Sequence, residues 1–217
     1  MISLPIAAAI FVLSFLLGSI PNGIIVGKVF YHTDIRSVGS GNIGTTNAIR
    51  ALGKKGGYAV FLLDFAKGVL SGLIALAIMA AVARADGALT CADGLCLAFL
   101  GAGLGHIFSP WLGFKGGKGI AVCVGAMFVT FGPVAALIEL ALFAAVVAAS
   151  KYVSAGSVAA AVLCPFMALW VFWGDWAAVA ICTLMAGVVI WAHRANIGRL
   201  RAGTERRIGS SHGKSQA

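Results

Sequence analysis

Seven apolar runs follow one another along the chain, separated by short polar or glycine-rich segments. The runs cover residues 4–29, 58–83, 94–109, 119–132, 134–149, 158–173 and 176–192. A helix needs about 20 apolar residues to cross the roughly 30 Å of hydrocarbon in a bilayer. In hydrocarbon only helices and closed barrels satisfy every backbone hydrogen bond. The pattern therefore predicts an all-α integral membrane protein with about seven transmembrane helices.

The lengths of the middle runs leave the span count open. The fourth to sixth runs have only 14 to 16 residues, so one of them is expected to be tilted, interfacial or re-entrant. Five or six spans are the alternative.

Charged residues make up only 11% of the chain, against roughly 25% in soluble domains. With 217 residues, seven spans leave no room for a separate soluble domain. We therefore expect a single transmembrane domain over 1–200 and a polar basic tail over 201–217, disordered beyond about residue 205. Residues 1–4 hold no Lys or Arg, so the first run reads as a retained helix rather than a cleaved signal.

The basic residues predict the orientation of the chain. If the N-terminus lies outside and the chain crosses seven times, 15 of the 16 Lys and Arg residues fall on the inner side and only Arg84 stays outside. Basic residues concentrate in cytoplasmic loops. We therefore expect the N-terminus outside and the C-terminus in the cytoplasm.

The five cysteines match no zinc or redox spacing. Most lie inside apolar runs, where cysteine acts as a small hydrophobe. A disulfide between Cys91 and Cys96 is the one alternative. No metal site and no cofactor are expected.

Segment 34–50 is glycine-rich and dense in hydroxyl and amide side chains. Its glycines, Gly39, Gly41 and Gly44, permit positive φ and close approach of a ligand. The donors are Ser40, Asn42, Thr45, Thr46 and Asn47. A helix can start directly after this turn, and backbone amides at such a start bind anions. Arg50 lies one turn further on and can fork onto a phosphate.

Two other readings of this segment are weaker. The glycines satisfy G-x-G-x-x-G, but a dinucleotide site needs a preceding strand, and a membrane helix precedes this one. The second alternative is a flexible connecting loop without a binding role, but the high density of hydrogen-bond donors argues against it.

Segment 113–119 is a second glycine-rich turn at the start of an apolar run. It holds Lys115, Gly116, Gly117, Lys118 and Gly119. It is not a P-loop, because Gly119 follows Lys118 where Ser or Thr is required. The alternative is that Lys115 and Lys118 bind no ligand and only fix the orientation of the chain in the membrane.

Two further inner segments add hydroxyl, amide and imidazole groups. Ser154 and Ser157 lie in the first, and His193 and Asn196 follow the last apolar run. Together the four segments offer the side chains of a site for one or two phosphate groups.

Several catalytic arrangements are missing. The one G-x-S-x-G, at 209–213, lies in the polar tail without the strand–turn–helix that a nucleophile elbow needs. No His is followed five positions later by Asp, so a His–Asp catalytic dyad of that spacing is absent from the sequence.

Asp64 and Lys67 lie one turn apart and suggest a structural ion pair. Glu139 is an intramembrane carboxylate, which is a functional candidate by default, although a packing role is equally compatible with its position.

Six motifs occur together in one order. They are Gly18-Ser-Ile-Pro21, Gly39-Ser-Gly-Asn-Ile-Gly-Thr-Thr-Asn47, Leu63-Asp-Phe-Ala-Lys-Gly68, Gly105-His-Ile-Phe108 with Phe114-Lys-Gly-Gly-Lys-Gly119, Tyr152-Val-Ser154 and His193-Arg-Ala-Asn196. From about residue 14 to 200 the chain resembles the bacterial acyl-phosphate:glycerol-3-phosphate acyltransferases of the PlsY type. The departures are Thr45, where Ala is usual, Ser109 before Pro110, Val122 for a common Thr, and Asn22 for an apolar residue. The one at Val122 puts a hydroxyl contact in doubt.

The resemblance implies a seven-helix enzyme of the bacterial cytoplasmic (inner) membrane with its active site on the cytoplasmic face. Its partners would be glycerol 3-phosphate, a long-chain acyl phosphate and membrane lipid, with no nucleic acid. It would make lysophosphatidic acid and phosphate, the first step of phospholipid synthesis. An indirect coupling to the enzyme that makes acyl phosphate is left open.

Roles follow as hypotheses. The backbone of 39–44, with Ser40, Asn42 and Thr46, would bind the donor phosphate, and Ser154 or Ser157 would complete that pocket. Arg50 and Lys118, with Lys115 as a weaker candidate, would bind the acceptor phosphate. His193 and Asn196 would hold the glycerol hydroxyls. Because phosphate is a good leaving group, we expect direct attack without an acyl-enzyme.

The competing function is a transporter or channel for a phosphate-bearing metabolite, which requires a polar path across the bilayer. A non-catalytic scaffold would leave the four glycine-rich polar segments without a purpose.

Overall fold

The computed structural model describes residues 3–86 and 91–208, and in this part of the chain every regular element is a helix. The elements are α1 (Leu4–Ser19), α2 (Asn22–Tyr31), η1 (Ile35–Ser37), α3 (Thr45–Asp86), α4 (Cys91–Ile107), η2 (Pro110–Leu112), α5 (Ile120–Thr130), α6 (Gly132–Ser150), α7 (Val153–Val171), α8 (Trp176–Ala192) and α9 (Arg194–Arg201). The helices coincide in order with the seven apolar runs, so the all-α prediction is confirmed.

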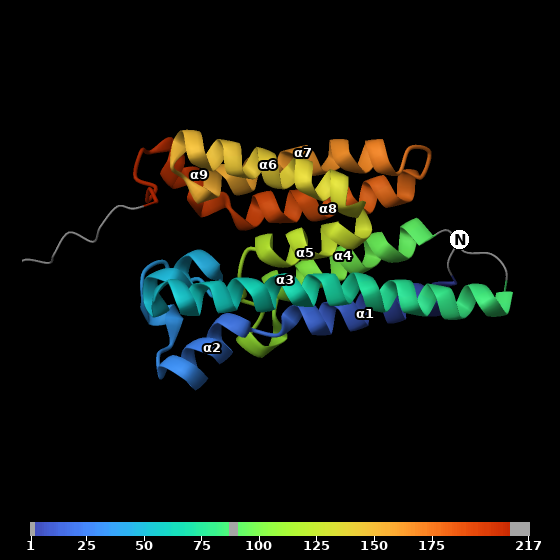
Figure 1. Cartoon of the computed structure of the whole chain (residues 1–217), viewed down its shortest axis with the longest axis horizontal. Helices are drawn as coiled ribbons and strands as arrows, with labels where there is room; N and C mark the ends of the chain where they lie inside the picture. The colour runs from blue at the N-terminus through green and yellow to red at the C-terminus, as the bar shows by residue number, and fades with distance from the viewer. Residues whose placement is uncertain (1–2, 87–90, 209–217) are drawn as a thin grey trace, which may run out of the picture.

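The long helices run side by side in three layers (Figure 1). Helices α6, α7 and α8 form one layer, α4 and α5 lie in the middle, and α1 and α3 lie on the other side, with contacts between neighbouring layers. Residues 32–44, 108–119, 150–153 and 193–208 lie toward the same end of this bundle, which we call the site end (Figure 1). The end at which α6 and α8 begin lies opposite.

Glycines allow the helices to approach closely. A Cβ on Gly18 would lie 2.2 Å from the carbonyl oxygen of Ala102, so α1 and α4 touch backbone to backbone. A Cβ on Gly125 would lie 2.0 Å from the carbonyl oxygen of Phe65, which joins α5 to α3 in the same way. Small residues at such contacts are typical of helices packed in lipid, where van der Waals contact replaces the hydrophobic effect.

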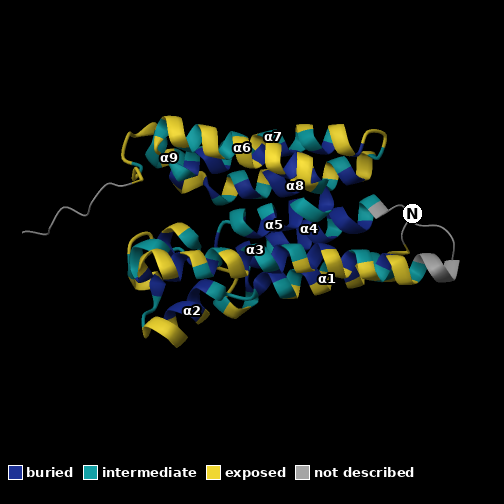
Figure 2. Cartoon of the chain, in the orientation of Figure 1, coloured by how far each residue is buried: buried dark blue, intermediate teal, exposed yellow. Residues whose placement is uncertain are grey.

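Burial follows these contacts. Buried residues concentrate where the layers meet, and exposed residues line the outer faces (Figure 2). The outer faces carry large apolar side chains such as Leu62, Phe166 and Trp173, as expected for a surface in contact with lipid.

In the described residues the structure supports the alternative of five or six spans in place of seven. Five helical segments are long and apolar enough to cross a bilayer: Leu4–Tyr31, Thr45–Val82, Ala92–Leu112, Gly132–Ser150 and Val153–Val171. A sixth arises if α8 and α9, bent by 54° at their junction, count as one span. Helix α5 has only 11 residues, about 16 Å of helix at 1.5 Å per residue, against about 30 Å of hydrocarbon.

The reason lies in the turn that precedes α5. The apolar run 119–132 includes Gly119 and Gly132, and both have positive φ, so the helix is confined to the residues between them. Helix α5 consequently begins further into the bundle than its neighbours (Figure 1).

Two smaller expectations concern the cysteines and the tail. Cys96 is a free, fully buried thiol whose Sγ lies 3.5 Å from the Sγ of Cys182, so the alternative of a Cys91–Cys96 disulfide is wrong. The expected disorder of the tail falls largely on residues 209–217, which lie outside the described residues. Before them, the amide of Ile208 donates a hydrogen bond to the carbonyl oxygen of Lys151.

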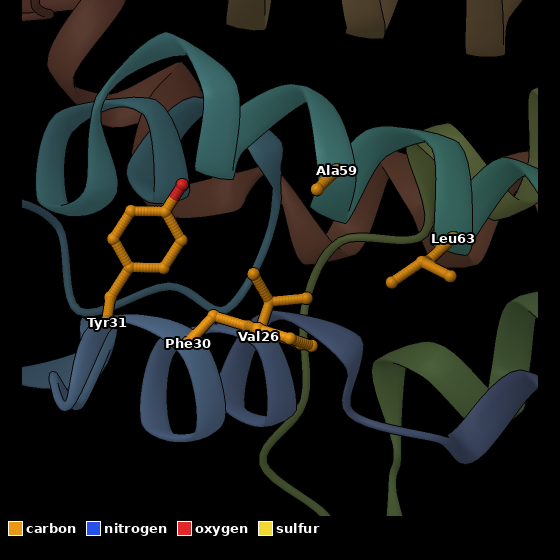
Figure 3. A pocket seen from close by; sticks show the side chains of 5 residues that line it. All are labelled: Val26, Phe30, Tyr31, Ala59 and Leu63. Atoms are coloured by element: carbon orange, nitrogen blue, oxygen red, sulfur yellow. The ribbon is translucent and has the colours of Figure 1, made fainter.

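A hollow of about 500 Å³ lies between α2 and α3 and is lined by Val26, Phe30, Tyr31, Ala59 and Leu63. In Figure 3 the Tyr31 ring stands between the two helices with its hydroxyl group toward α3. No charged side chain lines this hollow, so it does not qualify as a phosphate site.

Candidate active site

The first polar loop folds back on the start of α3. Gly39 and Gly41 have φ of +64° and +68°, which only glycine adopts at little cost. The amide of Gly41 donates to the carbonyl oxygen of Val38, and the amide of Gly44 donates to Oδ1 of Asn42. A Cβ on Gly39 would lie 3.5 Å from Cδ of Arg50, so the Arg50 side chain passes along this turn.

Asn47 holds this loop in place. It is buried, its Oδ1 accepts the amide of Ser40 at 2.8 Å, and its Nδ2 donates to the carbonyl oxygen of Ile35 at 2.8 Å. Both ends of its side-chain amide are therefore used within the protein. Ser40 and Thr46 are exposed, whereas the buried Thr45 Oγ1 has no hydrogen-bond partner among the described residues.

The second glycine-rich turn packs against the end of α4. The amide of Gly116 donates to the carbonyl oxygen of Ile107, and the amide of Gly117 donates to that of His106. Cβ atoms on Gly116 and Gly117 would lie 2.0 Å from the carbonyl oxygen and 2.1 Å from Nε2 of His106. These glycines therefore place the turn, and their amides are already committed to it. Lys115 is exposed.

His106 belongs to a buried polar network that joins α2, α3 and α4. Nζ of Lys67 lies 3.0 Å from Oδ1 of Asp64, 3.0 Å from Nδ1 of His106 and 2.8 Å from the carbonyl oxygen of Ile20. Nδ2 of Asn22 also donates to Asp64. The expected Asp64–Lys67 ion pair is confirmed, and it links α2, α3 and α4 to the second turn.

Lys118 projects from that turn to α9. Its Nζ donates to Oδ1 of Asn196 at 2.5 Å, and Nδ2 of Asn196 donates to Oε1 of Glu205 at 2.6 Å. The same Oε1 accepts the hydroxyl of Ser154 at 2.8 Å, and Oε2 accepts Nε of Arg199 at 2.6 Å. One carboxylate thus joins α7, α9 and the segment after α9.

Glu205 and Arg199 were not predicted as site residues. Residue 205 was expected to lie where a disordered tail begins, and only the return of the chain onto α7 and α9 places Glu205 in the site. The usable signal was that Glu205 is the one acidic residue after Asp175.

The electrostatics of the cluster favour an anion. Arg50 is half-buried and interacts electrostatically with Glu205, Arg199 and Arg206. Together with Lys118, this makes four cations around one carboxylate. Burial lowers the pKa of Lys118 to about 8. Although burial raises it, hydrogen bonds from Asn196, Ser154 and Arg199 hold the pKa of Glu205 below its ordinary value.

His193 lies at the junction of α8 and α9 and is 3% exposed. Its Nδ1 lies 2.8 Å from the carbonyl oxygen of Val189. A carbonyl can only accept, so Nδ1 carries the proton and Nε2 is left as the acceptor. Electrostatic interactions with Lys118 and Glu205 place His193 beside the same cluster.

The structure thus brings most of the predicted cationic and amide groups together. Lys118, Asn196 and Ser154 are linked through Glu205, with Arg50 and His193 within electrostatic reach of them. The Ser157 hydroxyl is bonded elsewhere than to Glu205, because it donates to the carbonyl oxygen of Val153 within α7. Among the described residues, no group of three or more His, Cys, Asp or Glu side chains is placed to hold a metal ion.

Comparison with known proteins gives one consistent answer. Residues 8–203 match the family model described as glycerol-3-phosphate acyltransferase. A glycerol-3-phosphate acyltransferase of Rhodopseudomonas palustris (strain BisB5) is 42% identical over 210 residues, which cover 96% of this chain and 98% of the relative. One of Listeria monocytogenes serotype 4a (strain HCC23) is 37% identical over 90% of this chain and 93% of its own.

Two solved structures share the fold. Both are crystal structures of PlsY (YgiH), an integral membrane glycerol 3-phosphate acyltransferase, in its glycerol 3-phosphate form and its lysophosphatidic acid form. The first superposes with a TM-score of 0.80 at 35% identity, and the second with 0.78 at 33%. Each match covers 94% of this chain and 96% of the other.

Proposed function

The chain belongs to the PlsY-type glycerol-3-phosphate acyltransferase family, and from that premise we propose that it transfers an acyl group from an acyl phosphate to the 1-hydroxyl group of glycerol 3-phosphate, directly and without an acyl-enzyme. The enzyme makes lysophosphatidic acid. The observation that carries the finer proposal is the cluster formed by Lys118, Asn196 and Ser154 around Glu205. It offers cations and donors for phosphate.

The acceptor phosphate binds to Arg50 and Lys118. The guanidinium offers two parallel donors to phosphate oxygens, and the ammonium of Lys118 is held by Asn196 at 2.5 Å. Four cations against one carboxylate leave a local excess of positive charge for a dianion. The exposed Lys115 adds to the field at the entrance.

The donor phosphate binds at the start of α3, on the turn 39–44 with Ser40, Asn42 and Thr46, and Ser154 on α7 completes the pocket. Backbone amides at a helix start after a glycine turn favour an anion. Asn47 serves as a positioning residue, because its amide group is fully engaged with the loop. Gly116, Gly117 and Gly119 shape the turn that carries Lys118, and the Ser157 hydroxyl is bonded within α7.

The chemistry needs little beyond positioning. The 1-hydroxyl oxygen attacks the acyl carbonyl carbon and forms the ester bond, and the bond between that carbon and the phosphate oxygen breaks. The electron pair leaves with phosphate. The hydroxyl proton passes to Nε2 of His193 or to the departing phosphate, while Asn196 holds the glycerol. Positioning of this kind contributes at most about 7–11 kcal/mol.

The membrane setting follows from the same residues. The protein is a multi-pass integral membrane protein, and the basic side chains gather at its site end. Because such side chains stay on the cytoplasmic side, we place the active site at the cytoplasmic face of the bacterial inner membrane. The acyl chain then extends from the site between the helices.

A transporter is less well supported. It needs a polar path between the two ends of the bundle. Within the described spans Asp64, Lys67 and His106 bond to one another, and Glu139 lines a mainly apolar cavity. These groups do not form a continuous route.

The test is acyl transfer by the purified protein in lipid, supplied with a long-chain acyl phosphate and glycerol 3-phosphate. We expect lysophosphatidic acid and phosphate in equal amounts, and a loss of turnover by orders of magnitude in Arg50→Ala with the protein still folded. Transfer from acyl-CoA but not from acyl phosphate would overturn the donor. Trapping of an acylated protein during turnover would overturn direct attack.

A further inference from the structure

A partly open, mainly apolar cavity of about 300 Å³ lies among the helices. Helices α3 to α8 supply its walls, which include the rings of Phe65, Phe128 and Phe143. Ile120 and Val189 are among the lining residues, and both lie close to residues of the candidate site. Ile120 is the second residue after Lys118, and the carbonyl oxygen of Val189 accepts the hydrogen bond from His193.

One acidic side chain interrupts these walls. Glu139 lines the cavity from α6 and is only 4% exposed. Its Oε1 has no hydrogen-bond partner among the described residues. An unpaired polar group in such surroundings costs several kcal/mol, whereas a leucine of similar size would cost nothing. The position therefore calls for a partner that enters the cavity.

That partner is neither a metal nor a cation from the protein side chains that line the cavity. No group of His, Cys, Asp and Glu in the described part of the chain is suited to a metal. The polar neighbours of Glu139 along the walls are the thiols of Cys123 and Cys164. The cavity has no other charged lining residue.

The depth of Glu139 identifies the group that can reach it. Helix α6 ends at Ser150 at the site end, so Glu139 lies 11 residues, or about 16 Å, along the helix from that end. A long acyl chain whose carbonyl carbon sits beside Lys118 and His193 would pass Ile120 and Val189 first and bring its outer half to Glu139.

We propose that Glu139 is a specificity-determining residue for the acyl chain, and that it binds a hydroxyl group carried on the outer half of the chain. This inference rests on the proposed function, because it takes the acyl phosphate as the occupant of the cavity. A carboxyl oxygen accepts a hydroxyl hydrogen bond whichever charge it carries. An unsubstituted chain fills the same space but leaves Oε1 without a partner.

The test compares two acyl phosphates of equal length, one unsubstituted and one with a hydroxyl group in its outer half. We expect the wild-type enzyme in lipid to show a kcat/KM about three- to tenfold higher for the hydroxylated donor, the range that one neutral hydrogen bond gives. Glu139→Leu should remove or reverse the preference, mainly by faster use of the plain chain. Glu139→Gln, which keeps an acceptor, should retain much of it.

Phe143→Leu is the matched control, because it changes the cavity wall and leaves the carboxyl group of Glu139 in place. It should keep the ratio of the kcat/KM values for the two donors. An equal ratio for the wild type and Glu139→Leu would overturn the inference while leaving the proposed function intact. A wild-type enzyme that prefers the plain chain would overturn it without any variant. A failure to use every acyl phosphate would overturn both proposals together.

Discussion

Lys118 donates a 2.5 Å hydrogen bond to the side-chain oxygen of Asn196, although 78 residues separate the two along the chain. The bond joins the turn before α5 to α9. Because Asn196 also donates a hydrogen bond to Glu205, a substitution of Lys118 or Asn196 also affects the residues that are bonded to Glu205.

The charge of Lys118 should control the pH dependence of acceptor use. Burial lowers its pKa from 10.5 to about 8, so the ammonium is present below that pH and is lost above it. We therefore expect kcat/KM for glycerol 3-phosphate to fall as the pH rises through about 8, after correction for spontaneous hydrolysis of the donor. Lys118→Arg stays charged and should not show this fall. A wild-type profile that stays level well above that pH would contradict the assignment.

Glu205 should stabilise the site end of the bundle. Glu205→Ala removes the acceptor of Ser154, Asn196 and Arg199, and we expect a loss of about 2 kcal/mol, or roughly 5 °C in the midpoint of thermal unfolding in detergent. Glu205→Gln should lose less. Because the carboxylate has a lowered pKa, its contribution is present above its ordinary pKa of 4.5 and disappears as the pH falls through the lowered value. The difference in midpoint should shrink accordingly in acid, and a difference that grows instead would refute the role.

Two helix glycines should respond in opposite ways to the same substitution. A Cβ on Gly125 would lie 2.0 Å from the carbonyl oxygen of Phe65, whereas a Cβ on Gly187 would meet nothing within 4 Å. We expect Gly125→Ala to lower stability by about 1–3 kcal/mol through overpacking, and Gly187→Ala to raise it slightly through helix propensity. Thermal unfolding of both variants in one detergent decides the matter, and equal midpoints would show that α3 and α5 do not touch as described.

The buried pair of Lys67 and Asp64 should be costly to break from one side only. Lys67→Met leaves an unpaired carboxylate that is 1% exposed, and we expect a loss of about 3–5 kcal/mol. The double variant Lys67→Met with Asp64→Asn removes that charge, keeps a similar shape and should recover much of the loss. If the double variant is no more stable than the single one, His106 and not Asp64 is the partner that matters.

Periodicity and composition were sufficient for the helices because an apolar run in a membrane protein has few alternatives. The break at Pro21 and the change of direction at Gly53, where φ is 76°, were not predicted. They occur inside runs or at single residues whose effect depends on what packs around them. The fourth run was among those expected to be tilted, interfacial or re-entrant. Hydropathy could not single out α5, because it counts Gly119 and Gly132 without regard to their positive φ.

The candidate site was predicted in its residue types and only partly in its geometry. Charge and hydroxyl content pointed to Arg50, Lys118, Ser154 and Asn196, which the fold brings near one another. Sequence could not tell that the amides of Gly116 and Gly117 are already bonded to α4. Nor could it anticipate a contact that depends on how the last described residues return to α7.

The shortness of α5 bears on a problem of solubility. The acceptor is a water-soluble anion, whereas the acyl chain of the donor belongs in oil, and the two must meet at one carbon atom. In the proposed mechanism, a helix that starts deep in the bundle, preceded by a glycine turn, leaves room for the polar phase to reach that atom. Each methylene group that thereby stays in hydrocarbon saves about 0.8 kcal/mol. In this arrangement glycerol 3-phosphate and water reach the acyl carbonyl carbon at its depth in the bilayer, and the acyl chain need not leave the hydrocarbon.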